Sequence, residues 1–280
     1  MTDPNRSTWD RIRGDRSVRL GAAIVGVVTG LALLAPWIAP YGFEAQHADA
    51  LLQPPSSTWW LGTDRLGRDV ASRLLFGARI SMTVALATSA IAMVLGTLWG
   101  AISGWVGGRV DEAMMRVVDA LYAFPDLLLV VFVATWLGQS MVGIVLSLSV
   151  VSWVTVARLV RGEVHVLRER PFVEAARALG LPPSRVVVRH VMPMVVGPLL
   201  ITLTFRIPAV ILAESTLSFI GLGLQAPLSS WGVMAAEGWV AMAFHPHLIL
   251  APAVAMCVTI FGFHLLGEGL RRALAVQVDA

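Results

Sequence analysis

Six apolar runs, each about long enough to cross a bilayer as a helix, alternate along the chain with shorter polar segments. The runs are 20–39, 80–104, 117–137, 141–157, 194–217 and 248–270. Only residues 138–140 separate the third run from the fourth, which predicts a tight helical hairpin there. The pattern predicts an all-α polytopic membrane protein with six transmembrane helices.

The composition agrees with this class, since 56% of residues are hydrophobic and 14% are charged. All 21 basic residues are Arg, so the chain has no P-loop lysine and is expected to have no ATPase site of its own. A single cysteine, Cys257, excludes an internal disulfide and a cysteine-rich metal site. His245 and His247 flank Pro246, and we expect a solvated turn there rather than a metal site.

The arginines predict the orientation of the chain. Sixteen of them fall in the N-terminal segment, in the loops 104–118 and 158–193, and in the C-terminal tail, whereas four lie between Arg65 and Arg79. The positive-inside rule makes the first group cytoplasmic, together with both termini. We expect a cytoplasmic segment 1–19, an uncleaved first helix 20–39, an external polar segment 40–79, a core 80–270 and a cytoplasmic tail 271–280.

The cytoplasmic loop contains a short predicted amphipathic helix. Its apolar positions recur at i, i+3, i+4 and i+7: Phe172, Ala175, Ala176 and Leu179. Pro171 suits the first helical position, and Gly180 followed by two prolines is a stop signal. Two interpretations remain open from the residues alone: a helix that enters a groove of a partner protein, or one that lies in the headgroup layer.

The same loop carries a family resemblance. Glu174-Ala175-Ala176, Gly180, His190 and Pro193 stand at spacings that closely resemble the EAA loop of permease subunits of ATP-binding-cassette importers. The resemblance implies the type I importer fold. It also implies that the loop 163–193 holds the coupling helix, which docks on an ATPase subunit through Glu174, Ala175, Ala176 and Gly180, with Phe172 and Leu179 on the docking stripe.

Three further segments narrow the resemblance to the C-type permease of the dipeptide and oligopeptide subgroup: 61–79, 214–223 and 265–271. The resemblance implies a bacterial inner-membrane complex with a homologous permease, two ATPase subunits that bind ATP and Mg, and an external substrate-binding protein. It implies peptide import; other members of the subgroup carry nickel chelates, haem, glutathione or sugars. His264, Glu268 and Arg272 depart from the family pattern near the C-terminus.

The external segment 40–79 nearly balances its positive and negative charges, which predicts a paired, folded polar cap. Asp64 with Arg68, and Arg65 with Asp69, are spaced for i, i+4 pairs on a helix. The residues favour a solvated helix on the outer leaflet, whereas the resemblance favours docking of the binding protein.

Ionisable residues inside membrane spans are functional candidates because burying them in lipid is costly. Arg206 lies twelve residues into the fifth run, or about 18 Å along a helix axis. It could line the pathway with Glu214 and Asp126 and attract a peptide carboxylate, or it could neutralise Asp119 or Asp126 structurally. The residues favour the structural interpretation.

A different class, an intramembrane serine protease, would need Ser140 as nucleophile and His264 as base. No His or Asn in the second run could stabilise an oxyanion, which weighs against this alternative. A gated channel is disfavoured because the chain has no filter sequence and no ring of like charges. Nucleic acid is not an expected partner.

Overall fold

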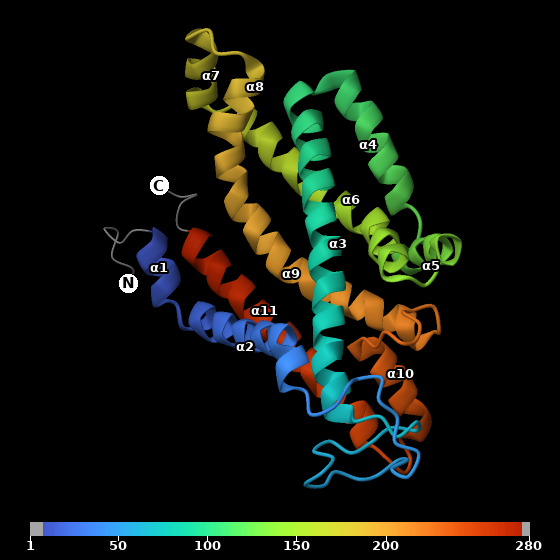
Figure 1. Ribbon diagram of the computed structural model, residues 1–280. Coiled ribbons are helices and arrows are strands. Elements are labelled where there is room, and N and C mark those ends of the chain that lie inside the picture. Colours follow the sequence, from blue (N-terminus) through green and yellow to red (C-terminus); the bar gives the residue numbers. More distant parts are fainter. Residues whose placement is uncertain (1–7, 276–280) are drawn as a thin grey trace.

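The computed structural model describes residues 8–275, which form helices joined by turns and loops (Figure 1). The elements in chain order are α1 (Thr8–Gly14), α2 (Arg16–Ile38), α3 (Val70–Val106), α4 (Gly108–Tyr122), α5 (Asp126–Leu137), α6 (Met141–Arg168), α7 (Pro171–Ala178), α8 (Pro183–Val186), the π-helical turn Val187–Val191, α9 (Met192–Phe219), α10 (Trp231–Ala241) and α11 (His247–Ala275). Residues 1–7 of the predicted N-terminal segment and 276–280 of the predicted tail lie outside the described range. The predicted all-α class is confirmed.

Five helices in the described range are long and apolar enough to cross a membrane: α2, α3, α6, the continuous segment Pro183–Phe219, and α11. The predicted span 117–137 is not a single helix; counted as one broken span, it brings the candidate spans in the described range to six. It is divided between α4 and α5, which meet at an angle of 87°. Pro125 explains the break, because it lacks an N–H donor and disfavours helical backbone in the residue before it.

Several spans are longer than predicted, and α3 and α6 show why. α3 begins at Val70 because the Asp69 carboxylate accepts the backbone N–H of Ser72 and caps the helix. α6 continues to Arg168, since its charged last turns have partners: the Arg161 guanidinium binds the Asp111 carboxylate through two contacts of 2.6 Å. The helix α10 was not predicted, because its eleven residues are too few for a span.

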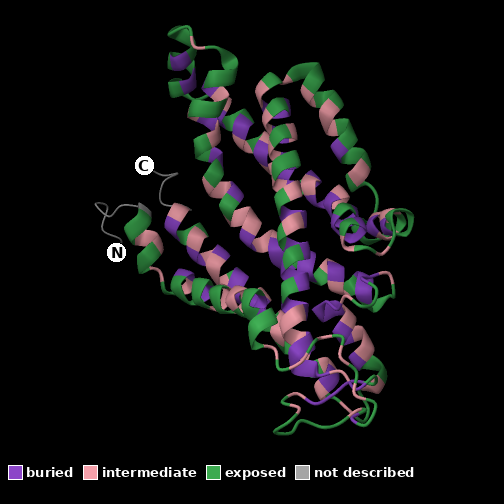
Figure 2. Ribbon diagram, viewed as in Figure 1, coloured by how far each residue is buried: buried purple, intermediate pink, exposed green. Residues whose placement is uncertain are grey.

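α3 and α6 pack closely along a stripe of glycines. A Cβ placed on Gly100 would lie 2.4 Å from the Ala157 carbonyl oxygen, and one on Gly96 would lie 2.7 Å from that of Trp153. Gly104 continues the stripe one turn further. Small residues let helix backbones approach where no side chain can fit between them. Figure 2 shows buried positions along both of these helices.

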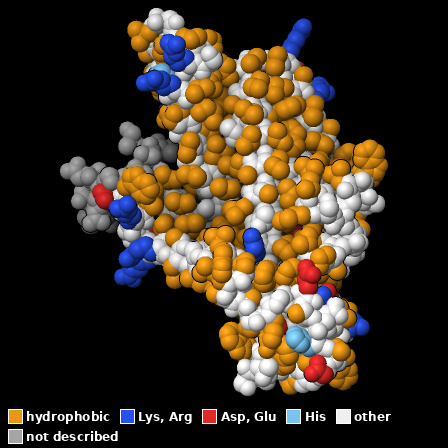
Figure 3. All heavy atoms as spheres, viewed as in Figure 1, with side chains coloured by type: hydrophobic (Ala, Val, Ile, Leu, Met, Phe, Trp, Pro, Cys, Tyr) orange, Lys and Arg blue, Asp and Glu red, His pale blue; other side chains and the backbone are white. Residues whose placement is uncertain are grey.

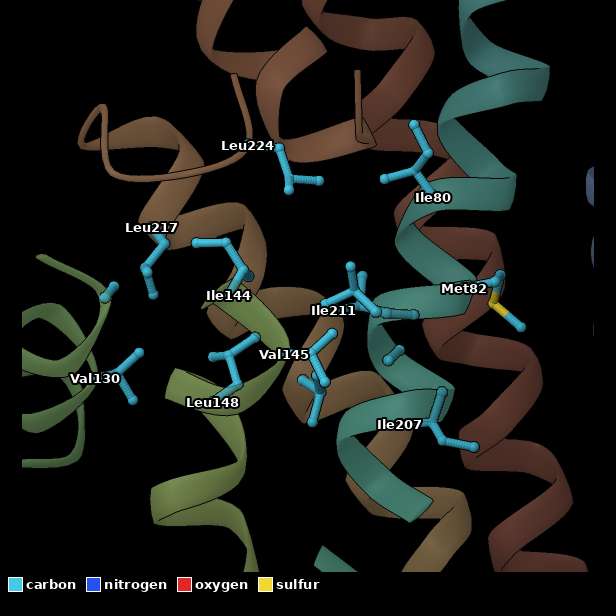
Figure 4. Close-up of a cluster of buried hydrophobic side chains, with 14 of the residues drawn as sticks. Ile80, Met82, Val130, Ile144, Val145, Leu148, Ile207, Ile211, Leu217 and Leu224 are labelled. Carbon is cyan, nitrogen blue, oxygen red and sulfur yellow. The ribbon is translucent and has the colours of Figure 1, made fainter. Parts of the chain in front are cut away.

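The main core lies where α3, α5, α6 and α9 meet (Figure 4). It includes Ile80 of α3, Val130 of α5, Leu148 of α6 and Ile211 of α9. The outer surface is also apolar, as Figure 3 shows over the middle of the molecule, with Val27, Leu98 and Val254 all more than half exposed. An apolar exterior on long helices is typical of proteins whose solvent is lipid.

The molecule has two distinct ends, at opposite tips of α3 (Figure 1). α7 and α8 form one end, and the loop 41–69 with α10 forms the other. The two termini of the described chain meet along the side, where the Arg272 guanidinium of α11 lies 3.2 Å from the Asp15 carboxylate at the start of α2.

Candidate coupling site and transport pathway

α7 is a two-turn helix whose ends follow from its sequence, as predicted. Pro171 occupies the first helical turn, and Gly180 adopts φ +79° directly after the helix. The N–H of Gly180 donates to the Arg177 carbonyl at 2.9 Å, and the N–H of Leu181 donates to the Ala176 carbonyl at 3.3 Å. This pair of bonds is a Schellman cap, so Gly180 is needed because the cap requires left-handed backbone.

Two side chains of α7 anchor it to the rest of the protein. Val173 is fully buried and Ala176 is 5% exposed. They join an apolar cluster with Val164 and Leu167 of α6 and with Val186 of α8. The predicted apolar stripe is therefore wrong for Ala176, which faces the protein, because Val173 at i−3 completes an inward face that the sequence pattern did not reveal.

The opposite face of α7 is exposed. Phe172, Glu174, Ala175 and Leu179 all reach solvent, and Leu179 is 82% exposed. A leucine and a phenylalanine standing together on a projecting tip are unusual for a surface that contacts only water. The structure thus brings together three of the predicted stripe residues, Phe172, Ala175 and Leu179, on one outward surface, which we call the docking face.

A cation–π contact connects α7 directly to α3. The Arg177 guanidinium carbon lies 4.7 Å from the centroid of the Trp105 ring. The Trp105 carbonyl in turn accepts an N–H of Arg168 at 3.0 Å. Displacement of α7 would therefore push on the end of α3 as well as on α6.

The end formed by the loop 41–69 and α10, which the sequence predicts to be external, holds a largely buried cluster of four charged residues, of which Glu237 is the most exposed. The Arg73 guanidinium contacts the Asp64 carboxylate at 2.5 Å and the Glu237 carboxylate at 2.6 Å. Arg68 binds the same two acids at 2.6 Å and 2.9 Å. Arg73 is 3% exposed. We call these four residues the external ion cluster; it fixes the loop 41–69 to α3 and α10.

The predictions for this segment are confirmed in part. The paired polar cap and the Asp64–Arg68 pair are present, but residues 64–69 form turns rather than a helix. The Arg65–Asp69 pair is wrong: Asp69 is buried as the cap of α3, and Arg65 is exposed. Arg73 and Glu237 were missed; a lone acid in the apolar stretch 231–244 was the available signal.

Arg206 and Asp126 line one pocket of about 210 Å³ between α5, α6 and α9. An Arg206 N–H donates to the Ser152 carbonyl at 2.9 Å. Within the described part of the chain, no salt bridge joins Arg206 to an acid. Asp119 pairs instead with Arg158, at 2.7 Å, so Asp119 is excluded as the partner of Arg206.

Glu214 does not reach this pocket. Its side chain is 1% exposed and accepts the hydroxyls of Ser218 at 2.8 Å and Ser230 at 2.6 Å. Ser230 also caps α10 through the N–H of Val233, at 3.2 Å. Glu214 and Arg206 are kept apart by their separation along α9, as expected. The Glu214 carboxyl instead connects α9 to the start of α10.

The protease residues have other partners. The Ser140 hydroxyl accepts the N–H of Gly143 at 3.0 Å and caps α6, and the His264 ring lies 5.4 Å from that of Phe205. Among residues 8–275, no group of three or more His, Cys, Asp or Glu side chains is placed to hold a metal ion. No nucleophile and base pair is formed by Ser140 and His264 in this range.

Apolar helices of spanning length with an apolar exterior define a polytopic membrane protein. The family described as the binding-protein-dependent transport system inner membrane component matches residues 93–278, and the N-terminal TM domain of oligopeptide transport permease C matches residues 4–55. The chain belongs to this family of importer permeases, in its C-type branch, as the sequence predicted.

Individual relatives agree over nearly the whole chain. The oligopeptide transport system permease protein OppC of Bacillus subtilis is 38% identical over 94% of this chain and 87% of its own length. The dipeptide permease DppC of the same organism is 36% identical over 96% and 84%. The glutathione transport system permease GsiD of Escherichia coli O6:K15:H31 is 38% identical over 98% and 91%.

Solved structures establish the fold. Two inward-facing structures of the MetNI methionine ABC transporter match with TM-scores of 0.58 and 0.61, at 17% and 15% identity. Each match covers 72% of this chain. The same matches cover 95% and 96% of the two transporter chains, respectively. The predicted type I importer fold is confirmed.

Proposed function

We propose that this chain is one permease subunit of an ATP-driven peptide importer in a bacterial inner membrane. It pairs with a homologous permease to enclose the translocation pathway. Two ATPase subunits, which bind ATP and Mg, act on it from the cytoplasm, and an external binding protein delivers the substrate. The segments 1–19 and 271–280 are cytoplasmic, 40–79 is external, and 80–270 forms the core.

The docking face of α7 carries this proposal. Its outward Phe172, Ala175 and Leu179 supply an apolar anchor with room beside it, which suits insertion of a helix into a partner's groove. Val173 and Ala176 hold the helix to α6 and α8, so force applied at the face passes into the membrane helices. Glu174, beside the face, adds a charge that can set the register of docking, and Gly180 ends the helix.

Peptides are the substrate class that the relatives support. The named relatives transport oligopeptides, dipeptides and glutathione, which is itself a tripeptide derivative. Nickel chelates and haem gain no support from these relatives. The same proposal includes docking of the binding protein on the external end. The docking loop would be the one that holds Asp64, Arg65, Arg68 and Asp69.

The test truncates Phe172 and Glu174 of α7, one at a time, in the assembled complex, reconstituted in proteoliposomes with its partner subunits. Phe172→Ala and Glu174→Ala should leave assembly intact but lower peptide uptake per ATP hydrolysed about tenfold, because docking contacts are lost. The control, Ser184→Ala, changes an exposed residue of α8 outside the docking face, and it should leave assembly and the coupling ratio unchanged.

Unchanged uptake per ATP in Phe172→Ala, Glu174→Ala and Gly180→Ala together would remove α7 as the coupling element. Absence of peptide uptake by the wild-type complex, with a loaded binding protein supplied, would remove the peptide assignment instead.

A further inference from the structure

The pocket between α5, α6 and α9 is lined by two opposite charges that attract each other without forming a salt bridge. Arg206 is partly buried in α9, and Asp126 starts α5 on another wall of the same pocket. Within the described residues, neither takes part in a salt bridge. An unpaired charge at membrane depth is costly, so such groups usually have a partner.

The Arg206 guanidinium is oriented but not saturated. One of its N–H groups donates to the Ser152 carbonyl at 2.9 Å, which fixes the side chain against α6. A guanidinium has five N–H donors in a planar fork suited to a carboxylate. The remaining donors therefore provide a site for an anion in the pocket.

Asp126 supplies the complementary charge. It is exposed at the first turn of α5, directly after the break at Pro125. Its carboxylate can accept N–H donors from an ammonium group. The rest of the pocket lining is mostly apolar and includes Val130 of α5 and Leu148 of α6, which both belong to the core where these helices meet (Figure 4).

We propose that Arg206 and Asp126 form a subsite for the two free termini of a short zwitterionic peptide, Arg206 for the α-carboxylate and Asp126 for the α-ammonium. This rests on the proposed function of peptide import. The termini of an extended dipeptide are separated by about 7 Å at most, so a ligand of this class can touch both charges only if they are apart. A structural salt bridge would leave no such gap.

The test measures selectivity rather than total uptake. The reconstituted complex is supplied with binding protein loaded with Ala-Ala, with its C-terminal amide or with its N-acetyl derivative, and the affinity of the binding protein for each is measured separately. In the wild type, uptake should favour Ala-Ala over both derivatives beyond the preference of the binding protein. Arg206→Gln should reduce the preference for Ala-Ala over the amide about tenfold, whereas Arg206→Lys should retain most of that preference. Asp126→Asn should reduce the preference for Ala-Ala over the acetyl derivative about tenfold.

Arg158→Gln is the matched control, because it removes the Asp119 salt bridge outside the pocket and should change neither ratio. If both variants lower uptake of all three peptides equally, or leave both ratios unchanged, the subsite is wrong although peptide import stands. If the wild-type complex imports none of the peptides, the proposed function fails first, and the subsite with it.

Discussion

The two ends of the molecule are held by opposite kinds of interaction. At the external end, the external ion cluster places two arginines and two acids between a loop, α3 and α10. At the other end, α7 is attached by Val173, Ala176, its Schellman cap and one cation–π contact. Buried ion clusters are costly to break, whereas a helix held by two small apolar side chains can shift. The external end is therefore the fixed one, and α7 is suited to receive a displacement.

The largest effect should come from breaking the external ion cluster. Arg73→Gln removes the buried cation of the cluster and leaves Arg68 as the remaining partner of both acids, so it should lower the free energy of unfolding by about 3 kcal/mol, the low end for breaking a buried ion pair. Thermal unfolding in nanodiscs measures this. Arg65→Gln, on an exposed residue of the same loop, should change stability little. Equal stability of the two variants would show that the cluster does not fix this end.

The next effect concerns the helices that join the two ends. Gly100→Ala would put a methyl group against backbone atoms of α6, 2.4 Å from the Ala157 carbonyl oxygen, and should cost about 1–3 kcal/mol. Gly162→Ala on α6 has open space around its Cβ and should be neutral or slightly stabilising, because alanine favours helix. If both variants unfold at the same temperature, the close approach of α3 and α6 is not needed.

A smaller effect is expected at α7. Gly180→Ala forces a left-handed conformation on an alanine and should cost about 1–2 kcal/mol locally. Gly180→Asn should cost less, since asparagine tolerates this conformation. Hydrogen exchange of the α7 amides measures the difference without requiring global unfolding. Faster exchange in the asparagine variant than in the alanine variant would contradict the capping role.

The smallest effect is expected at the salt bridge between Asp15 and Arg272, which joins the two ends of the described chain. Burial opposes ionisation of Asp15, but Arg272 and the N–H groups of Val18 and Ser17 outweigh it and hold the pKa of this carboxyl below its usual value. A lowered pKa means that the stabilisation exists above the unfolded pKa, near 3.9, and is lost as the pH falls through the folded value. Asp15→Ala should therefore cost about 1 kcal/mol at pH 7, mainly through the lost helix cap, and the difference should shrink below about pH 4. A constant difference between pH 7 and pH 3 would contradict this assignment.

The sequence predicted most of the fold because long apolar runs and proline or glycine stops are local signals. The positions of α2, α6, α7 and α11 follow from them. It did not reveal that the run 117–137 is broken at Pro125 into two helices that meet at 87°. The mean hydropathy of an apolar run hardly changes when one residue is proline, although the effect of a proline on the backbone is large.

The sequence could predict which residues belong to the candidate site, but not how their side chains are arranged. Family spacing identified α7, yet only the fold shows that Ala176 faces inward while Leu179 faces outward. The Arg73–Glu237 contact joins residues 164 positions apart, which no local pattern reveals. The partner of Arg206 could not be chosen from the sequence, since Asp119 and Asp126 occur on the same run and only the structure pairs Asp119 with Arg158.

Site-directed cross-linking tests the docking face most directly. Cys257 is the only cysteine, so Cys257→Ser provides a background for single-cysteine variants. In the assembled complex, Leu179→Cys should cross-link to an ATPase subunit, and Trp60→Cys, exposed at the external end, should not. A cross-link from Trp60→Cys to the ATPase, with none from Leu179→Cys, would contradict the account.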